Sequence, residues 1–336
     1  MVLDQRTLSL LSEPVRLALG TKTAAATSAL LAAVMQDATR CRAQLHKLSA
    51  YVARRQAQAR HAAASEPLQN VLRKLPKLPS YAYELATRLE DGNIEVQEVV
   101  NLIQRDPALA SFVLKTVNSA YYNLPEKITS VYHAVVFLGY SAVSQLVLTQ
   151  ALGSLVPREP AFDALYDHSL LISVLAHDIA RLTKASNPLT ASTIGLLHAV
   201  GELVLLLLQK KHHGAAELLT LVDEASVGAS LLQAWQLPER IYRVIEEQHT
   251  PAFAPPVSLS HAFKEDAAIL YLAHLCHDRL LQQAETPDTF LDEYLAVLNL
   301  PDFEAFWHTA LLPSLRQQLK RLPERIRQLL QATPAP

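Results

Sequence analysis

Histidine is the residue of this chain best suited to chemistry, because imidazole exchanges protons near neutral pH and is a common metal ligand. The chain has 13 histidines. An adjacent His and Asp on one helix can both reach a divalent metal, so three dipeptides invite comparison. They are His177-Asp178, His198-Ala199 and His277-Asp278. A two-residue match is weak by itself, so the surroundings of each histidine decide how it is interpreted.

His198 lies in the apolar segment LLHAVGELV, residues 196–204, and Glu202 follows it by one helical turn. Both side chains would be costly to bury without partners. The spacing predicts satisfied core residues, paired with each other or with a third group such as His168. A retained metal ligand and an exposed position are the alternatives. Ala199, directly after His198, offers no ligand atom.

The other two dipeptides are predicted to lie away from a common site. His177 follows His168 by nine residues, which places it about half a turn away on a helix, so these two histidines cannot close on one ion. His274, His277 and Asp278 are spaced i, i+3 and i+4 and therefore occupy neighbouring positions on a helix surface. We interpret these three residues as a solvated polar face.

Helices must position these residues, because the composition favours helices over strands. The 336 residues include eight glycines, 19 prolines and few aromatic residues. Leucine and alanine, which are abundant, are strong helix formers, and proline marks helix starts and ends. Strand-like alternation of apolar and polar residues is scarce. We therefore predict an all-α protein.

Three parts are expected along the chain. Residues 1–64 form an N-terminal helical segment that packs on the main body, with a partner or dimer helix as the alternative. Residues 68–283 form the main domain, and residues 284–336 form C-terminal helices that pack on it. Within the main domain, short helices precede residue 155, and longer, more apolar helices follow, one of them over residues 193–209.

Local signals in the first half predict where its helices start and stop. Asp106 and Pro107 predict a helix start, because Asp can accept from the free amides and the fixed φ of Pro suits the first helical position. Gly139 is predicted to end one helix just before the next begins. The stretch NSAYYNLP predicts an ordered corner between helices, and a recognition surface is the alternative. Its candidate residues are Asn118, Ser119, Tyr121 and Tyr122.

Charge and hydropathy limit the classes of partner. Lys and Arg number 30 and Asp and Glu number 32, so no net field attracts nucleic acid or an anionic membrane. The longest apolar stretch, residues 194–208, contains His198 and Glu202 and is interpreted as a buried helix rather than a membrane span. Two distant cysteines and the lack of a signal peptide pattern favour a reducing cytoplasm.

Several ordered motifs resemble the HDOD domain of bacterial signalling proteins. The chain carries L-P-x-L-P, D-P-A-L, N-S-A-Y-Y, I-T-S and A-V-x-x-L-G in that order. The segments YDHSLLISVLAHDIARL, LLHAVGELVLL, VGASLLQAWQLP and VIEEQHTP are similar to its second half, which is related to the HD metal-dependent phosphohydrolases. The resemblance covers roughly residues 68–252. It implies an HDOD-type multi-helix bundle with an N-terminal helical extension.

The resemblance also implies where the metal site of a catalytic HD protein would lie. His168 matches the His of the first helix, and His198 matches the His of the His-Asp pair, with Ala199 where the Asp should be. That Asp bridges the ions and balances their charge. An alanine leaves a dication uncompensated among apolar side chains. We therefore expect no metal, no cofactor and no catalysis.

The remaining matched positions also depart from the catalytic pattern. Glu224 stands about where a further His would lie. His249 fits one of a His pair, with Gln248 in place of the other, and His274 replaces the late Asp. The set His168, His198, Ala199, Glu224, His249 and His274 is thus expected to be vestigial.

The resemblance implies a role as an output or scaffold module in bacterial signal transduction. The expected partner is a protein of a signalling pathway, or a second copy of the chain in a homo-oligomer, with no nucleic acid and no membrane. Two alternatives stay open. One is an HD-type phosphohydrolase with the substitute ligands His168, His198, His249 and His274. The other is a sensor that binds a nucleotide in the vestigial cavity.

Overall fold

The computed structural model describes residues 79–90, 95–119, 126–153, 159–211, 222–282 and 290–317, together with residues 70, 72, 124, 288 and 327. These residues form helices joined by turns and contain no strand, which confirms the all-α prediction. The predicted N-terminal segment, residues 1–64, lies outside the described residues.

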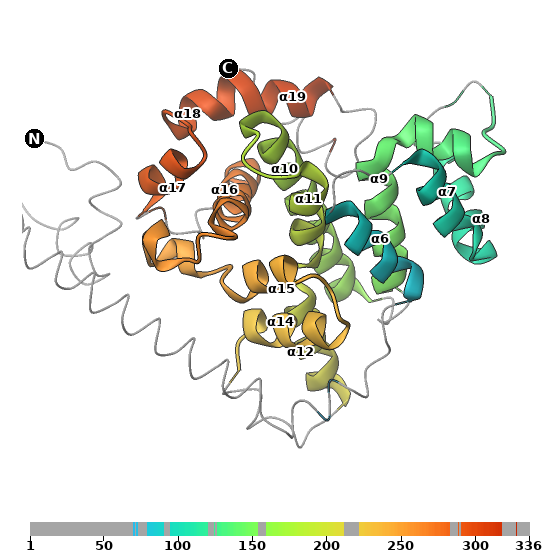
Figure 1. Ribbon diagram of the computed structural model, residues 1–336, viewed down its shortest axis with the longest axis horizontal. Helices are drawn as coiled ribbons and strands as arrows, with labels where there is room; N and C mark the ends of the chain where they lie inside the picture. The colour runs from blue at the N-terminus through green and yellow to red at the C-terminus, as the bar shows by residue number, and fades with distance from the viewer. Residues whose placement is uncertain are drawn as a thin grey trace, which may run out of the picture.

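The helices of the first half lie together on one side of the molecule (Figure 1). They are α6 (Ser80–Glu90), α7 (Val96–Gln104), α8 (Pro107–Val117) and α9 (Val131–Gly153). Their apolar residues recur every three or four positions, so each helix has one face to bury. These faces meet in a shared core that includes Leu85, Val99, Val113 and Val135.

The predicted start of α8 and the predicted break at Gly139 are both present. The Asp106 carboxylate accepts hydrogen bonds from the amides of Ala108 at 2.8 Å and Leu109 at 3.2 Å, with Pro107 next in the chain. Gly139 has φ 79°, a conformation that a residue with a Cβ adopts only under strain. The two parts of α9 on either side of it bend by 105°.

The predicted corner after α8 is ordered at its first two residues. The Asn118 side-chain amide donates to the Leu114 carbonyl at 2.9 Å and to the Ile128 carbonyl at 2.6 Å, and its oxygen accepts from the Ile128 amide at 2.7 Å. The Ser119 hydroxyl donates to the Thr116 carbonyl at 2.7 Å. Asn118 therefore fixes the chain that leads to α9. Tyr121 and Tyr122 lie outside the described residues.

The helices of the second half surround a larger core. They are α10 (Pro160–Thr183), α11 (Pro188–Leu197), α12 (Val200–Lys211), α14 (Glu224–Ala234), α15 (Glu239–Glu246) and α16 (Lys264–Leu281), with the short turns η2 (Thr250–Ala252) and η3 (Pro256–Ser258). Helix α10 packs against α11 and α16, and α14 packs against α12 and α15. Nearly every turn of α16 is buried, including Ile269, Leu272 and Cys276.

Short C-terminal helices extend this core. They are α17 (Leu291–Val297), α18 (Phe303–Phe306), the π-helical turn η4 (Trp307–Leu311) and α19 (Leu312–Gln317). Trp307 and Leu311 are buried, and Ser314 of α19 donates to the buried Asp178 of α10 at 2.8 Å. Arg181 also donates to Ser314. The domain boundary at residue 283 stays a prediction.

The long helix expected over residues 193–209 is broken in two, which corrects the sequence interpretation. Helix α11 ends at Leu197, His198 and Ala199 form a turn, and α12 begins at Val200. The apolar pattern alone could not reveal the break, because both helices are apolar on most sides. His198, in this turn, lies in the core and is only 3% exposed.

The stretch Pro188–Leu208 is long and apolar enough to cross a membrane by length and composition. However, 78% of its apolar window is buried against the rest of the protein, as in the core helix of a folded domain. The two bent parts of α9, Val131–Tyr140 and Ala142–Ala151, pass the same test only if they are counted as one span.

Glycines allow two pairs of helices to touch at the backbone. A Cβ on Gly195 of α11 would lie 2.8 Å from the Ser173 Cα of α10. A Cβ on Gly201 of α12 would overlap the Glu224 carbonyl of α14 and lie 2.7 Å from the Gly228 amide. Because the obstructing atoms belong to the backbone, the neighbouring helix would have to move as a unit.

We therefore expect Gly201→Ala to destabilise the protein, since forcing extra volume into a packed core costs about 1–3 kcal/mol. Gly153→Ala is the matched control, because a Cβ there meets no atom within 4 Å. Its effect should stay within about 0.5 kcal/mol, as for most surface substitutions. Urea denaturation followed by circular dichroism measures both. Equal stability of the two variants would contradict the close packing of α12 on α14.

Candidate functional site

Three histidines from three separate elements meet between the helices of the second half. His168 lies on α10, His198 lies in the turn between α11 and α12, and His274 lies on α16. One ring nitrogen of each lies within 4.8 Å of those of the other two. The Nε2 atoms of His168 and His198 are 3.0 Å apart. We call these three residues the histidine triad.

A hydrogen bond from Nδ1 to a backbone carbonyl oxygen orients two of the three rings, those of His198 and His274. Nδ1 of His198 lies 2.7 Å from the Gly195 carbonyl oxygen, and Nδ1 of His274 lies 2.9 Å from the Leu270 carbonyl oxygen. A carbonyl oxygen only accepts, so Nδ1–H must be the donor in both contacts. The Nε2 atom of each ring is then turned toward the centre of the triad.

His277 supports the triad from the next turn of α16, a role that the sequence interpretation missed. Its Nε2 atom lies 3.0 Å from Nδ1 of His168, and its Nδ1 atom lies 3.4 Å from the Asp278 carboxylate. The predicted solvated face of His274, His277 and Asp278 is therefore wrong. His277 and Asp278 are only 8% and 7% exposed.

The error over α16 has a physical origin. The i, i+3 and i+4 spacing correctly places the three side chains on neighbouring positions. It cannot say whether that face meets solvent or another helix. Here α10, α11, α15 and α17 all contact α16, so its polar face is enclosed and its polar groups bind one another. The available signal was the apolar residues around them, such as Tyr271 and Cys276.

Burial keeps the triad neutral at physiological pH. Burial first, and then the charges of neighbouring histidines, lower the pKa of His168 to about 3. Burial is also the main cause that lowers the pKa of His274 to about 4. The pKa of the fully enclosed His198 lies well below its ordinary value for the same reasons. Unprotonated imidazoles have a free lone pair for a donor or a cation.

Glu224 and His249 form an ion pair of their own. Nε2 of His249 lies 2.6 Å from the Glu224 carboxylate, and both side chains are partly exposed. Burial lowers the pKa of His249, but the hydrogen bond and charge of Glu224 outweigh it, so the pKa is raised. The hydrogen bond from His249 lowers the pKa of Glu224. The charge of His249 also reaches His198 and His274.

The structure also separates the two readings of His198 and Glu202. His198 contacts His168, so the interpretation with a third group is confirmed. Glu202 is exposed on α12, so its predicted place in the core is wrong and the exposed alternative holds for it. His177 lies beside Asp178, with 3.3 Å between Nδ1 and the carboxylate, as expected for a residue that does not share an ion with His168. Ala199 is 5% exposed.

Comparison with known proteins identifies the family. The HDOD domain family model matches residues 75–251, which is more than half of the chain. The chain belongs to the HDOD family. The HDOD match spans α6 to α15 and the first turn after α15, so it contains His168, His198 and His249, whereas His274 lies beyond it.

The relatives of this HDOD chain agree with the fold. An uncharacterized protein of Treponema pallidum is 27% identical over 198 residues, or 54% of this chain, which span 39% of that relative's length. An HDOD domain protein from Geobacter sulfurreducens has a TM-score of 0.54 at 20% identity, covering 82% of this chain and 97% of that one.

A candidate signal transduction protein from Marinobacter aquaeolei has a TM-score of 0.63 at 19% identity. The match covers 83% of this chain and 66% of that one. At these identities the two solved structures show a common fold, which confirms the HD-related helical bundle.

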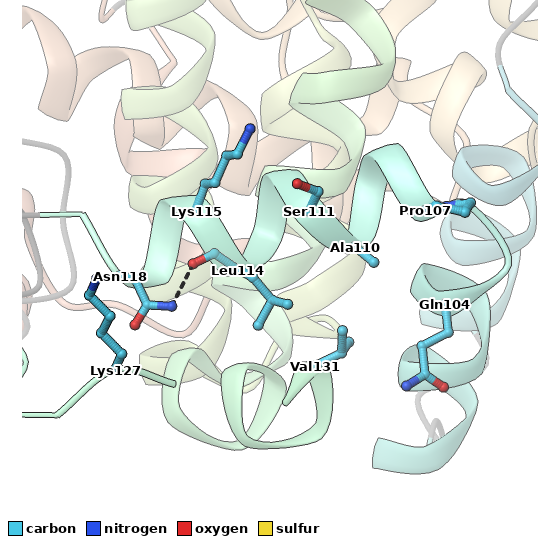
Figure 2. Close-up of a pocket in the computed structure, with 9 residues that line it drawn as sticks. All are labelled: Gln104, Pro107, Ala110, Ser111, Leu114, Lys115, Asn118, Lys127 and Val131. Atoms are coloured by element: carbon cyan, nitrogen blue, oxygen red, sulfur yellow. Dashed lines mark hydrogen bonds between the residues drawn. The ribbon is translucent and has the colours of Figure 1, made fainter. Parts of the chain in front are cut away.

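The HDOD domain also has a groove of about 780 Å³ on its first half (Figure 2), and its lining contains none of the triad histidines. It is lined by Gln104, Pro107, Ala110, Ser111, Leu114, Lys115, Asn118, Lys127 and Val131. Pro107 and Asn118 are thus brought to one surface. Asp106 lines a separate, smaller pocket with Tyr81. The lining of the larger groove has two lysines and no acidic side chain.

The lowered pKa values predict the acid sensitivity of the domain. A histidine with a pKa near 3 or 4 when folded and about 6.5 when unfolded binds fewer protons in the folded state. Its contribution is therefore fully present above about pH 6.5 and is lost as the pH falls toward those folded values. We expect the free energy of unfolding to decrease steadily from pH 7 to pH 5.

Chemical denaturation in a buffer with a chelator measures this slope, because only protons then compete for the ring nitrogens. His274→Leu removes one titrating group and should flatten the slope relative to the wild type. A stability that does not change between pH 7 and pH 5 would contradict the buried, neutral triad.

Proposed function

We propose that this chain is a non-catalytic regulatory module of a bacterial signalling pathway that acts in the cytoplasm by binding a partner protein. Two observations support the pathway: the chain belongs to the HDOD family, and its fold is shared with a candidate signal transduction protein. Since the chain spans about two-fifths of its curated relative from Treponema pallidum, the activity of any longer relative is not carried over.

Ala199 is the observation that carries the non-catalytic role. In the catalytic HD pattern this position holds an Asp that bridges the metal ions. Here a methyl group occupies it, at 5% exposure, between two apolar helices. Two acids of the second half, Glu224 and Asp278, each bind a histidine. The group of potential ligands that the described residues form contains three histidines and no carboxylate, so it lacks the bridging anion that this reaction uses.

The groove beside α8 is the surface that we assign to the partner. Lys115 and Lys127 make it basic, and Ala110 and Leu114 supply apolar floor. Next to it, the first turns of α9 expose Tyr132 by 45% and Val136 by 57%, one helical turn apart. A groove with two lysines, together with exposed apolar side chains at the start of α9, suits a protein segment that carries both acidic and apolar side chains.

A metal-dependent phosphohydrolase is the second candidate, and the convergence of the histidine triad favours it. His249, the fourth substitute ligand named for this reaction, binds Glu224 instead of joining the triad. A nucleotide sensor has no comparable support, because the larger groove lies on the first half of the chain, away from the vestigial positions.

A hydrolysis assay separates the two candidates. The substrates are bis(p-nitrophenyl) phosphate and cyclic dinucleotides, each with added Mn²⁺. We expect wild type and His198→Gln to give the same background rate, because no bridging carboxylate is present to position a nucleophile. Turnover by the wild type that His198→Gln abolishes would reject the regulatory proposal and support the phosphohydrolase.

Charge reversal tests the groove. The variant Lys115→Glu with Lys127→Glu should lose a partner that is captured by the wild type, because acidic side chains would then face like charges. Lys184→Glu, at the exposed end of α10, makes the same type of charge change elsewhere and should keep that partner. Affinity capture after crosslinking in cells, read by quantitative mass spectrometry, measures the ratio.

The capture gives clear outcomes. A protein enriched by the wild type and the Lys184→Glu control, and reduced at least about tenfold by the double variant, supports the assignment, since a tenfold loss corresponds to about 1.4 kcal/mol. Recovery of the chain itself, with the same dependence on the groove, would identify a second copy as the partner. An identical set of captured proteins for all three would count against this surface.

A further inference from the structure

The positions of the protons in the triad can be followed from the groups that only accept. The carbonyls of Gly195 and Leu270 accept from Nδ1–H of His198 and His274. A neutral imidazole carries only one N–H. The Nε2 atoms of His198 and His274 therefore both present a lone pair.

The same reasoning extends to His168 through its neighbour. The Asp278 carboxylate accepts from Nδ1–H of His277, so Nε2 of His277 has a lone pair. That lone pair accepts from Nδ1–H of His168 at 3.0 Å. Nε2 of His168 is then the third ring nitrogen with a lone pair and no proton.

Three lone pairs that face one another are unfavourable unless a cation lies between them. The Nε2 atoms of His168 and His198 are only 3.0 Å apart, yet neither has a hydrogen to donate. A single proton could be shared by that pair, but it would create a buried imidazolium and leave the lone pair of His274 without a partner. A metal ion can accept lone pairs from all three nitrogens at once.

The spacing also fits a metal. Two nitrogens at about 2.0–2.1 Å from one zinc ion lie roughly 3–3.4 Å apart when their bonds subtend an angle between a right angle and the tetrahedral angle. The observed 3.0 Å lies in this range, and the third ring nitrogen is within 4.8 Å of the other two.

We infer that His168, His198 and His274 bind one divalent transition-metal ion, of the class of Zn²⁺, through their Nε2 atoms. Imidazole nitrogen suits zinc, whereas Mg²⁺ and Ca²⁺ prefer oxygen ligands, which the triad lacks. Three histidines leave the fourth position of a tetrahedral ion open to water or a small anion. This proposal reverses the sequence-based expectation of no metal.

The surroundings of the triad resemble the outer contacts of established zinc ligands. Ligating histidines usually donate their other N–H to a carbonyl or carboxylate, which fixes the ring and raises its basicity. His198 and His274 donate to carbonyls, and His168 donates through His277 to Asp278. The Asp278 charge, one histidine away, also offsets part of the charge of the dication.

An ion at this position would join three elements that are distant in the sequence. It would connect α10, the turn between α11 and α12, and α16 at the centre of the second half. The proposed regulatory function does not depend on it. Such an ion would be structural, or would respond to a ligand at its open position, without the bridging carboxylate that hydrolysis requires.

The test uses the full chain, stripped with EDTA, dialysed and titrated with ZnCl₂. Isothermal titration and elemental analysis should both give about one zinc per chain, with a higher Tm, because the ion binds only the folded state. Co²⁺ in place of zinc should give the intense visible absorption of a four-coordinate site. His168→Gln, His198→Gln and His274→Gln should each lose these signals.

Two further variants distinguish the loss of a metal ligand from a general loss of folded structure. His133→Gln changes an exposed histidine on α9 and should bind zinc as the wild type does. His277→Gln removes only the outer contact and should weaken zinc binding about 10- to 100-fold while the helical circular dichroism is retained. A graded loss of affinity in a folded variant is not expected from a general loss of structure.

Either of two results would reject the proposed metal site. One is that the folded wild type takes up no zinc or cobalt at micromolar concentrations. The other is that the triad variants bind zinc as tightly as His133→Gln. The readout is independent of the proposed function. Zinc binding without hydrolysis supports both proposals, hydrolysis with zinc overturns only the regulatory function, and absence of zinc overturns only the metal site.

Discussion

The backbone contact between α10 and α11 is the constraint on which the histidine site depends. Gly195 allows α11 to approach Ser173 so closely that any side chain at this position would meet the main chain of α10. The Ser173 hydroxyl donates to the Ser192 carbonyl at 2.7 Å and fixes the register of the two helices. With the register fixed, His198 at the end of α11 contacts His168. The Gly195 carbonyl is also the group that orients the His198 ring.

Helix α16 completes the site because polar contacts near its start hold it in place, together with the core. Near its start, the buried Asp266 binds Arg240 of α15 and Ser186 of the loop before α11. A buried carboxylate is stabilised only when it is paired and hydrogen-bonded, so these contacts fix the position of α16 along its axis. At this position of the helix, His274 and His277 both lie beside His168.

Local signals in the sequence were sufficient for much of the fold. Asp106 with Pro107, and Gly139 with its positive φ, act within a few residues of themselves, so the helix limits that they predict are present. The family resemblance located the vestigial positions, and His168, His198 and His274 do meet. Spacing along one helix could not show which side of α16 is enclosed, because that depends on helices from other parts of the chain.

The break at His198 and Ala199 escaped prediction for a related reason. Apolar residues continue on both sides of it, so the periodic pattern shows no change. The helices on the two sides of this turn have different neighbours: α11 packs along α10, and α12 packs along α14 at Gly201 and Gly228. The sequence could not predict the proton positions in the site either, because they depend on carbonyls that lie near each ring only in the folded chain.

Helices α6 and α9 each supply residues to both hydrophobic cores. On α6, Leu85 belongs to the smaller core while Ala82 and Ala86 belong to the larger one; on α9, Val147 and Leu148 divide in the same way. Each core therefore includes side chains from helices that also contribute to the other core. The two cores should melt in one cooperative transition, and a chain cut between α9 and α10 would leave both fragments with exposed apolar surface.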